Sequence, residues 1–320
     1  MPSWSAILTE MQQEVAKGNA SAADTIRRKY LALISSKTER NTIFYATKCT
    51  QPCNVDPRLI TITDEDIQGF MEVVHGLSGT NLDLILHSPG GSIEAAGAIV
   101  SYLRTKFTDL RVIVPNYAMS AATMIACASN QIIMGKHSFI GPIDPQVYLQ
   151  TPLGFRSIPA QAIIDQFERA KIECEDPKKL AAWMPILSQY GPDLLIESQN
   201  ALDLSRKLVS EWLEKYMFIG QANAGELAGI TAGKLANHNE FKSHGHHIGI
   251  NQARELGLNV DDLERDQVFQ DLVLSAFHAT TLSFDATTAV KIIENQNGKG
   301  FLKLIAPPSP SPSPGPTPST

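Results

Sequence analysis

The sequence predicts an α/β protein built on a mostly parallel, layered sheet, and two observations support this prediction. Short apolar runs typical of buried strands alternate with helix-like segments from about residue 42 to about residue 140. Two strand-to-helix junctions carry small residues, at Gly90-Gly91 and at Ser120-Ala121. No stretch approaches the ~20 uninterrupted apolar residues of a membrane-spanning helix. The alternation predicts crossover connections between parallel strands.

Composition and charge are those of an ordinary globular protein. Of the 320 residues, 43% are hydrophobic and 19% are charged, and the net charge of -6 argues against a nucleic-acid or anionic-membrane partner. The first residues lack the basic and apolar regions of a secretory signal, so we expect a cytoplasmic protein without a membrane span. The four cysteines do not form a disulfide framework, and Cys49 and Cys53 lack the second pair or nearby histidine of a metal site.

The expected elements of the first half follow one another in a regular order. Two amphipathic helices in residues 5–36 precede a first strand at residues 42–47, and an acidic first turn opens a helix over residues 63–74. Buried strands are expected at residues 82–86 and 111–114, each followed by a helix, at residues 92–104 and from residue 120 onward. Residues 131–134 and 138–140 predict two further short strands.

The second half is largely helical. Helices are expected at residues 160–173, 178–189 and 193–216, and after a polar, histidine-rich loop at residues 241–249 two more follow at residues 251–256 and 267–280. Residues 289–305 predict a terminal hairpin with Asn297-Gly298 at its turn.

Five regions are therefore expected along the chain. They are an N-terminal helical extension (1–40), the main core (41–158), a helical subdomain or oligomerisation arm (159–240), the C-terminal part of the core with its hairpin (241–305) and a disordered Pro/Ser tail (306–320).

The two small-residue junctions together predict a nucleophile beside an oxyanion hole. A glycine pair after a buried strand lets the backbone approach a substrate closely, although alone it is most simply a tight turn. Ser120 stands at a helix start, where free amides and the helix dipole stabilise negative charge near its oxygen, although alone it is most simply an N-cap. One β-α unit separates the two features, so we expect them to act jointly.

Three stretches carry a resemblance to a known family. Residues 84–91 (LILHSPGG), 118–122 (AMSAA) and 141–146 (GPIDPQ) resemble the Clp-fold serine proteases of the ClpP/crotonase superfamily. The chain most resembles the serine dehydrogenase proteinase (SDH proteinase) family, over roughly residues 40–305. The resemblance implies a ClpP/crotonase-like layered β-α spiral, and a serine endopeptidase that hydrolyses peptide bonds.

The resemblance also implies a catalytic triad in the order serine, aspartate, histidine. Asp144 occupies the position where ClpP has its histidine, so the histidine comes later, and the candidates are His238, His244, His246 and His247. We favour His244, because its Ser-His-Gly segment precedes residues 253–258 much as the family's His-Gly segment does. Before the resemblance is counted, a turn residue between two prolines is an equally good interpretation of Asp144.

Each residue of this set has an ordinary role in acyl transfer. By this resemblance, His244 is expected to take the Ser120 hydroxyl proton and later to give it to the leaving amine, while Asp144 is expected to hold the imidazole tautomer. The oxyanion binds to backbone amides, with the hole formed by Gly90, Gly91 and Ala121.

Other bases remain open in the sequence. Lys136 permits a Ser-Lys dyad, although a solvated lysine is expected there, and His137 and His87 are further candidates, with His87 expected to pack behind the site. A metal site at His244-x-His246-His247 lacks a separate ligand group with its own spacing.

The expected partners follow from these interpretations. We expect a peptide or protein substrate, no metal or other cofactor, and homo-oligomerisation, as Clp-fold proteins usually assemble as rings. No Walker-type loop is present, and the Pro/Ser tail could recruit a partner. Two alternatives are a crotonase-like enzyme, which would use the same amides to stabilise a thioester enolate with coenzyme A, and a Clp-fold scaffold without activity.

Overall fold

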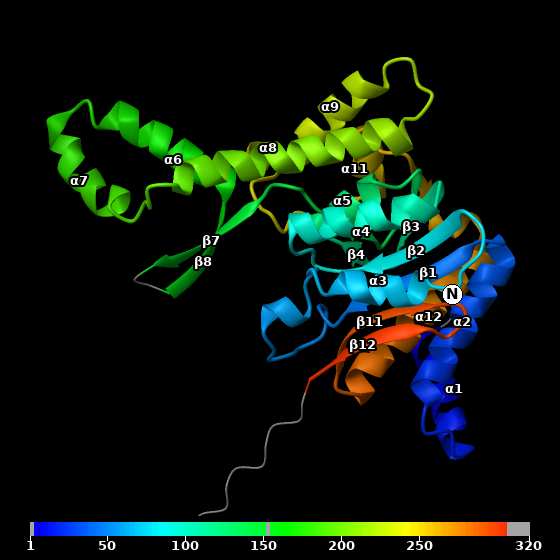
Figure 1. Cartoon of the computed structure of the whole chain (residues 1–320). Coiled ribbons are helices and arrows are strands. Elements are labelled where there is room, and N and C mark those ends of the chain that lie inside the picture. The colour runs from blue at the N-terminus through cyan, green and yellow to red at the C-terminus, as the bar shows by residue number, and fades with distance from the viewer. Residues whose placement is uncertain (1–2, 152–153, 306–320) are drawn as a thin grey trace, which may run out of the picture.

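A seven-stranded sheet forms the centre of the protein (Figure 1). The computed structural model describes residues 3–151 and 154–305, so the expected Pro/Ser tail lies outside the described residues. The strand order is β10-β5-β3-β2-β1-β11-β12. The bounds are β1 (Asn41–Thr47), β2 (Asn81–His87), β3 (Asp109–Val114), β5 (Gln131–Met134), β10 (Val260–Asp262), β11 (Ala289–Asn295) and β12 (Gly300–Leu304).

Pairing is parallel from β10 through β1 and antiparallel at β11 and β12. The predicted mostly parallel sheet and the terminal hairpin are therefore confirmed. Strand β2 is buried on both faces, with Leu84 in one hydrophobic cluster and Ile85 in the other. Burial on both faces explains why the strand sequences are continuous apolar runs rather than alternating ones.

Helices cover both faces of the sheet. On one face lie α3 (Asp66–Val74), α4 (Ile93–Lys106) and α5 (Ala121–Cys127), and on the other lie α2 (Ala22–Thr38) and α12 (Gln267–Ala286), with α1 (Trp4–Ala16) against α12. Helix α2, within the expected N-terminal extension, packs on the sheet through Leu31 and Ile34. None of the helices in the described residues combines the length and apolar character needed to cross a membrane.

A second, three-stranded sheet lies beside the first and consists of β4 (Tyr117–Ala118), β6 (Phe139–Ile140) and β9 (Ile248–Gly249). Residues 248–249 were expected to be part of a loop. The expectation was wrong because a two-residue strand has no periodicity of its own and exists only through its pairing with β6.

An arm projects from the body of the molecule (Figure 1). It begins with the antiparallel hairpin β7 (Gln146–Thr151) and β8 (Gly154–Pro159) and continues with α6 (Ala160–Glu173) and α7 (Pro177–Leu187). Helix α8 (Leu194–Trp212) returns to the body and ends in a π-helical turn, η2 (Leu213–Met217). The arm helices were predicted, whereas the hairpin was not.

Five further elements lie within the residues that the structure describes. They are the 3-10 turns η1 (Pro57–Leu59) and η3 (Leu263–Arg265) and the helices α9 (Ala224–Leu235), α10 (His238–Phe241) and α11 (Ile250–Glu255).

Candidate active site

The small sheet brings three expected site residues to one edge. Strand β4 runs parallel to β6, with Ala118 opposite Ile140, and β9 runs antiparallel to β6, with Ile248 opposite Ile140. The carboxyl ends of β4 and β6 therefore lie at the same edge as the amino end of β9. Ser120 follows β4, Asp144 follows β6 and His244 precedes β9, so all three leave the sheet at this edge.

Ser120 occupies a strained turn between β4 and α5. Its backbone has φ 53° and ψ -120°, a region that non-glycine residues rarely adopt and that costs on the order of 1–3 kcal/mol. The Met119 amide donates to the Ser88 carbonyl at 3.0 Å and holds the turn against the preceding crossover unit. The Ser120 side chain is half-buried and its hydroxyl has no hydrogen bond to any described residue. A strand-turn-helix geometry of this kind exposes a hydroxyl for attack.

The glycine pair lies directly against this turn. Gly90 has φ 97°, and a Cβ there would lie 2.6 Å from the Met119 carbonyl oxygen and 2.7 Å from Ser120 Cβ. The amides of Gly91 and Ala121 have no acceptor among the described residues. Two amides without an acceptor, one from each of two neighbouring crossover units, thus lie beside the serine turn, where amides could serve as oxyanion donors.

Asp144 is a buried carboxylate held by two histidines. Its side chain is 1% exposed. Its Oδ1 lies 2.7 Å from His244 Nδ1 and its Oδ2 lies 2.9 Å from His238 Nδ1, and Gln146 Nε2 donates to Oδ2 at 3.2 Å. Because the carboxylate can only accept, Nδ1 of each ring donates and Nε2 of each ring is left as a base.

The four candidate histidines therefore divide into two pairs. His238 and His244 contact Asp144, whereas His246 lies 3.3 Å from Gln252 Oε1 and His247 stacks on Phe139 at 3.6 Å. No group of three or more His, Cys, Asp and Glu side chains suited to a metal ion occurs in the part of the chain that the structure describes.

Lys136 and His137 lie at the other end of the small sheet. They precede β6, whereas Ser120 follows β4. The exposed Lys136 donates its backbone amide to Glu264 Oε1 at 2.9 Å, and His137 Nε2 lies 3.0 Å from the Pro115 carbonyl oxygen. The structure does not bring either side chain to the serine.

His87 packs behind the site. Its ring lies between those of Tyr117 and Phe277, at 4.7 Å and 4.9 Å, and its Nε2 is 3.5 Å from Cys49 Sγ. Its Nδ1 is buried with no partner among the described residues. Burial lowers the pKa of His87 to about 4, so the ring is neutral near pH 7.

Acid should therefore destabilise the protein through His87. Above pH 6.5 the ring is neutral in both states, whereas between pH 6.5 and about 4 only the unfolded chain takes up the proton, so the free energy of unfolding falls as the pH drops. We expect this contribution to reach roughly 3 kcal/mol near pH 4. Urea unfolding of wild type and His87→Phe at pH 7 and pH 4.5 measures it, since the variant should lose less stability over this interval. Equal losses would contradict the assignment.

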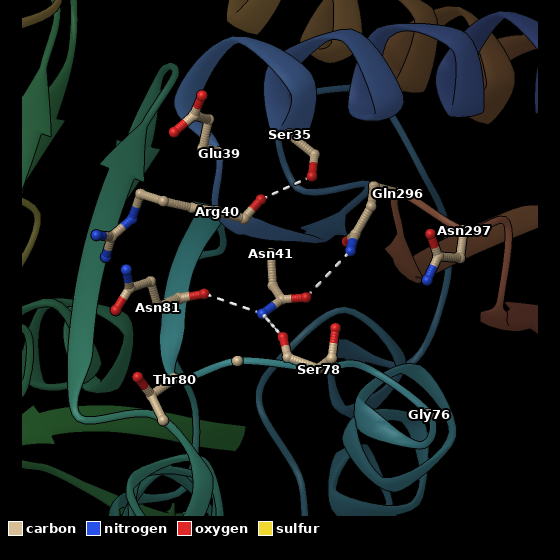
Figure 2. A pocket seen from close by; sticks show the side chains of 11 residues that line it. Ser35, Glu39, Arg40, Asn41, Gly76, Ser78, Thr80, Asn81, Gln296 and Asn297 are labelled. Atoms are coloured by element: carbon tan, nitrogen blue, oxygen red, sulfur yellow. Dashed lines mark hydrogen bonds between the residues drawn. The ribbon is translucent and has the colours of Figure 1, made fainter.

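A polar cavity of about 360 Å³ lies at the opposite end of the main sheet (Figure 2). Asn41 and Asn81 begin β1 and β2, so the cavity is at the amino ends of these strands. Its polar groups bond to one another: the Asn41 amide donates to the carbonyls of Ser78 and Asn81 at 2.7 and 3.1 Å, and Gln296 donates to Asn41. Parallel sheets bind ligands at their carboxyl ends, where Gly91 lies, so this cavity is not the candidate site.

Comparisons with known proteins identify the family of the chain. Residues 57–279 match the family described as ClpP-like SDH-type serine proteinase. The chain is 32% identical over 210 residues to the uncharacterized protein MJ0137 of Methanocaldococcus jannaschii, a match covering 65% of this chain and 63% of the relative. It is 29% identical over 195 residues to the uncharacterized protein MJ1495 of the same organism, covering 60% and 56%. The chain thus spans less than two thirds of the length of either relative.

Among solved structures, a mutant of the membrane-bound stomatin-specific protease 1510-N is similar at 15% identity and a TM-score of 0.37, over 65% of this chain and 77% of that chain. The family match confirms the resemblance drawn from the sequence and is consistent with the ClpP-like α/β fold described above. Because that match spans more than half of the chain, the protein belongs to the family of ClpP-like SDH-type serine proteinases.

Proposed function

We propose that the protein hydrolyses peptide bonds with Ser120 as nucleophile, His244 as general base and Asp144 as the group that orients the base. The main support is the contact of 2.7 Å between buried Asp144 and His244 Nδ1. This contact lies at the sheet edge from which the strained Ser120 turn also leaves. Family membership supports the reaction class.

The proposed reaction has two steps, the formation of an acyl-serine ester and its hydrolysis. Ser120 Oγ forms a bond to the substrate carbonyl carbon as its proton passes to His244 Nε2, and the carbonyl π pair moves to the oxygen, facing the amides of Gly91 and Ala121. The C–N bond then breaks and His244 gives its proton to the departing amine. Water repeats the sequence on the acyl-serine ester and restores the free hydroxyl.

His244 suits the role of base better than His238. Its contact with Asp144 is shorter, 2.7 Å against 2.9 Å, and its side chain is more exposed, 27% against 14%, so a substrate reaches it more readily. His238 holds the second oxygen of the same carboxylate and so fixes the direction of Asp144.

The proposed substrate is a peptide or protein, and we further propose that the protein assembles with copies of itself through the arm. Tyr148 and Phe155 lie on the same face of the β7–β8 hairpin, because Phe155 pairs with Gln150, two residues from Tyr148. These two side chains are 75% and 82% exposed. Exposed apolar side chains that lie together on one face, as these two do, are typical of interaction surfaces.

A fluorophosphonate tests the nucleophile. Attack by an activated serine on phosphorus releases fluoride and leaves a stable adduct, so we expect one adduct per chain, located at Ser120 by peptide mass spectrometry. Ser120→Ala should take up no label. Ser101→Ala, which changes an exposed serine on α4, should be labelled like wild type.

Two results would contradict the proposal. Wild type that takes no label at Ser120 but binds acyl-coenzyme A would indicate crotonase-like chemistry. Wild type that takes no label, cleaves no peptide and assembles identically as Ser120→Ala would indicate a scaffold without activity.

A further inference from the structure

We propose that a buried ion pair between Lys291 and Asp66 positions the oxyanion hole, by fixing the three-residue segment 61–63 against which Gly91 lies. The inference rests on the proposed function for its catalytic consequence. Its structural part, that the ion pair holds this segment in place, stands on contacts alone.

The ion pair lies between the main sheet and α3. Lys291 Nζ, on β11, donates to Asp66 Oδ1 at 2.6 Å and to the Thr61 carbonyl at 2.8 Å, and Tyr45 Oη, on β1, donates to Asp66 Oδ2 at 2.8 Å. The side chains of Lys291 and Asp66 are 0% and 1% exposed. A buried carboxylate and a buried ammonium group are each very costly unpaired, so the two side chains hold one another in a defined geometry.

Segment 61–63 is tied to this pair on both sides. The Thr61 carbonyl accepts from Lys291. The Thr63 amide donates to Asp66 Oδ2 at 3.0 Å, and the Asp66 amide donates back to the Thr63 carbonyl at 3.0 Å. Ile62, between the two threonines, is thereby fixed from either end.

Ile62 in turn holds the glycine pair. Its amide donates to the Gly90 carbonyl at 2.8 Å, and its carbonyl accepts from the Ser92 amide at 3.0 Å. A Cβ on Gly91 would overlap the backbone nitrogen and oxygen of Ile62, so the two backbones touch with no side chain between them. A shift of Ile62 is therefore passed directly to the Gly91 amide that faces the oxyanion.

The chain offers a matched control on the same strand. Glu294 of β11 forms a buried ion pair with Arg27 at 3.1 Å, with side chains 0% and 1% exposed, and its other oxygen pairs with the more exposed Arg28 at 2.6 Å. Ile292 and Ile293 belong to opposite core clusters, so Glu294 faces α2 and α12 whereas Lys291 faces α3. Removing the Arg27–Glu294 pair disturbs the core without touching segment 61–63.

The test compares two double variants, each of which replaces an ion pair by neutral side chains. Lys291→Met/Asp66→Asn removes the donor to the Thr61 carbonyl without leaving a buried charge, and Arg27→Met/Glu294→Gln is the control. We expect hydrogen exchange at the Ile62 and Ser92 amides to become at least about tenfold faster in the first variant only. The labelling rate at Ser120 and kcat should fall by about 10- to 100-fold there, with KM nearly unchanged, because a misplaced donor weakens only transition-state stabilisation.

Exchange at Ile62 and Ser92 that stays as slow as in wild type would overturn the inference, as would an equal loss of kcat in the control. Should the first variant not fold, Tyr45→Phe removes only the phenol bond to Asp66 and should still speed exchange at both amides, by about threefold. If the fluorophosphonate does not label Ser120 in wild type, the proposed function is overturned instead. The exchange rates at Ile62 and Ser92 then still decide whether the ion pair holds segment 61–63 in place.

Discussion

Replacing His244 by alanine is expected to lower kcat for peptide hydrolysis by on the order of 10⁴-fold or more, whereas His238→Ala should lower it by less than about tenfold. Removing the base leaves only the oxyanion hole and substrate binding to accelerate the reaction. Removing His238 leaves the 2.7 Å contact between Asp144 and His244 in place. Turnover of a fluorogenic peptide, measured alongside circular dichroism to confirm folding, gives both values.

The reverse pattern would assign the base to His238 and would contradict the role given to His244. The comparison is informative because the two imidazoles bind opposite oxygens of one carboxylate. Each alanine variant therefore removes one histidine donor to Asp144 and leaves the other histidine in place, which makes the two variants controls for each other.

Gly90→Ala should reduce fluorophosphonate labelling of Ser120 by at least about 10²-fold, since one oxyanion donor alone is worth this much. The added Cβ would lie 2.6 Å from the Met119 carbonyl oxygen and 2.7 Å from Ser120 Cβ, and the backbone at φ 97° disfavours any side chain. The turn must move away from Gly90, and Ser120 moves with it.

Gly97→Ala is the matched control for this prediction. Gly97 lies within α4, and a Cβ there would have nothing within 4 Å. Alanine favours a helix over glycine by roughly 0.5–1 kcal/mol, so this variant should label like wild type and be slightly more stable. Normal labelling of Gly90→Ala would show that the glycine turn does not position the serine.

The sequence predicted those helices and strands whose formation depends on their own residues and on the residues next to them in the chain. Strand β2 is a buried apolar run followed by Gly90-Gly91, and Ser92 then caps α4 by accepting from the Ala95 amide, so strand, turn and helix are all encoded locally. The β7–β8 hairpin was missed because it pairs only with itself, outside the main sheet, and no buried face imposes a clear alternation on it.

The residues alone pointed to the candidate site where motifs lie close together in the chain, whereas the pairing of Asp144 with a distant histidine was expected only from the family resemblance. Ser120 and the glycine pair sit at recognisable strand-to-helix junctions. Asp144 lies 94 residues from His238 and 100 from His244, and residue spacing contains no information about which ring reaches the carboxylate. Lys291 and Asp66 are 225 residues apart, so only the folded chain shows that they act on the same segment.

At position 120, the stability of the folded protein and the presence of a hydroxyl group place opposite demands on the residue type. Glycine adopts φ 53° without the steric penalty that serine carries there. Selection for survival at high temperature alone would therefore favour glycine at position 120 and discard the hydroxyl. Serine at this position therefore lowers the stability of the folded state, a cost that is common at sites used for chemistry.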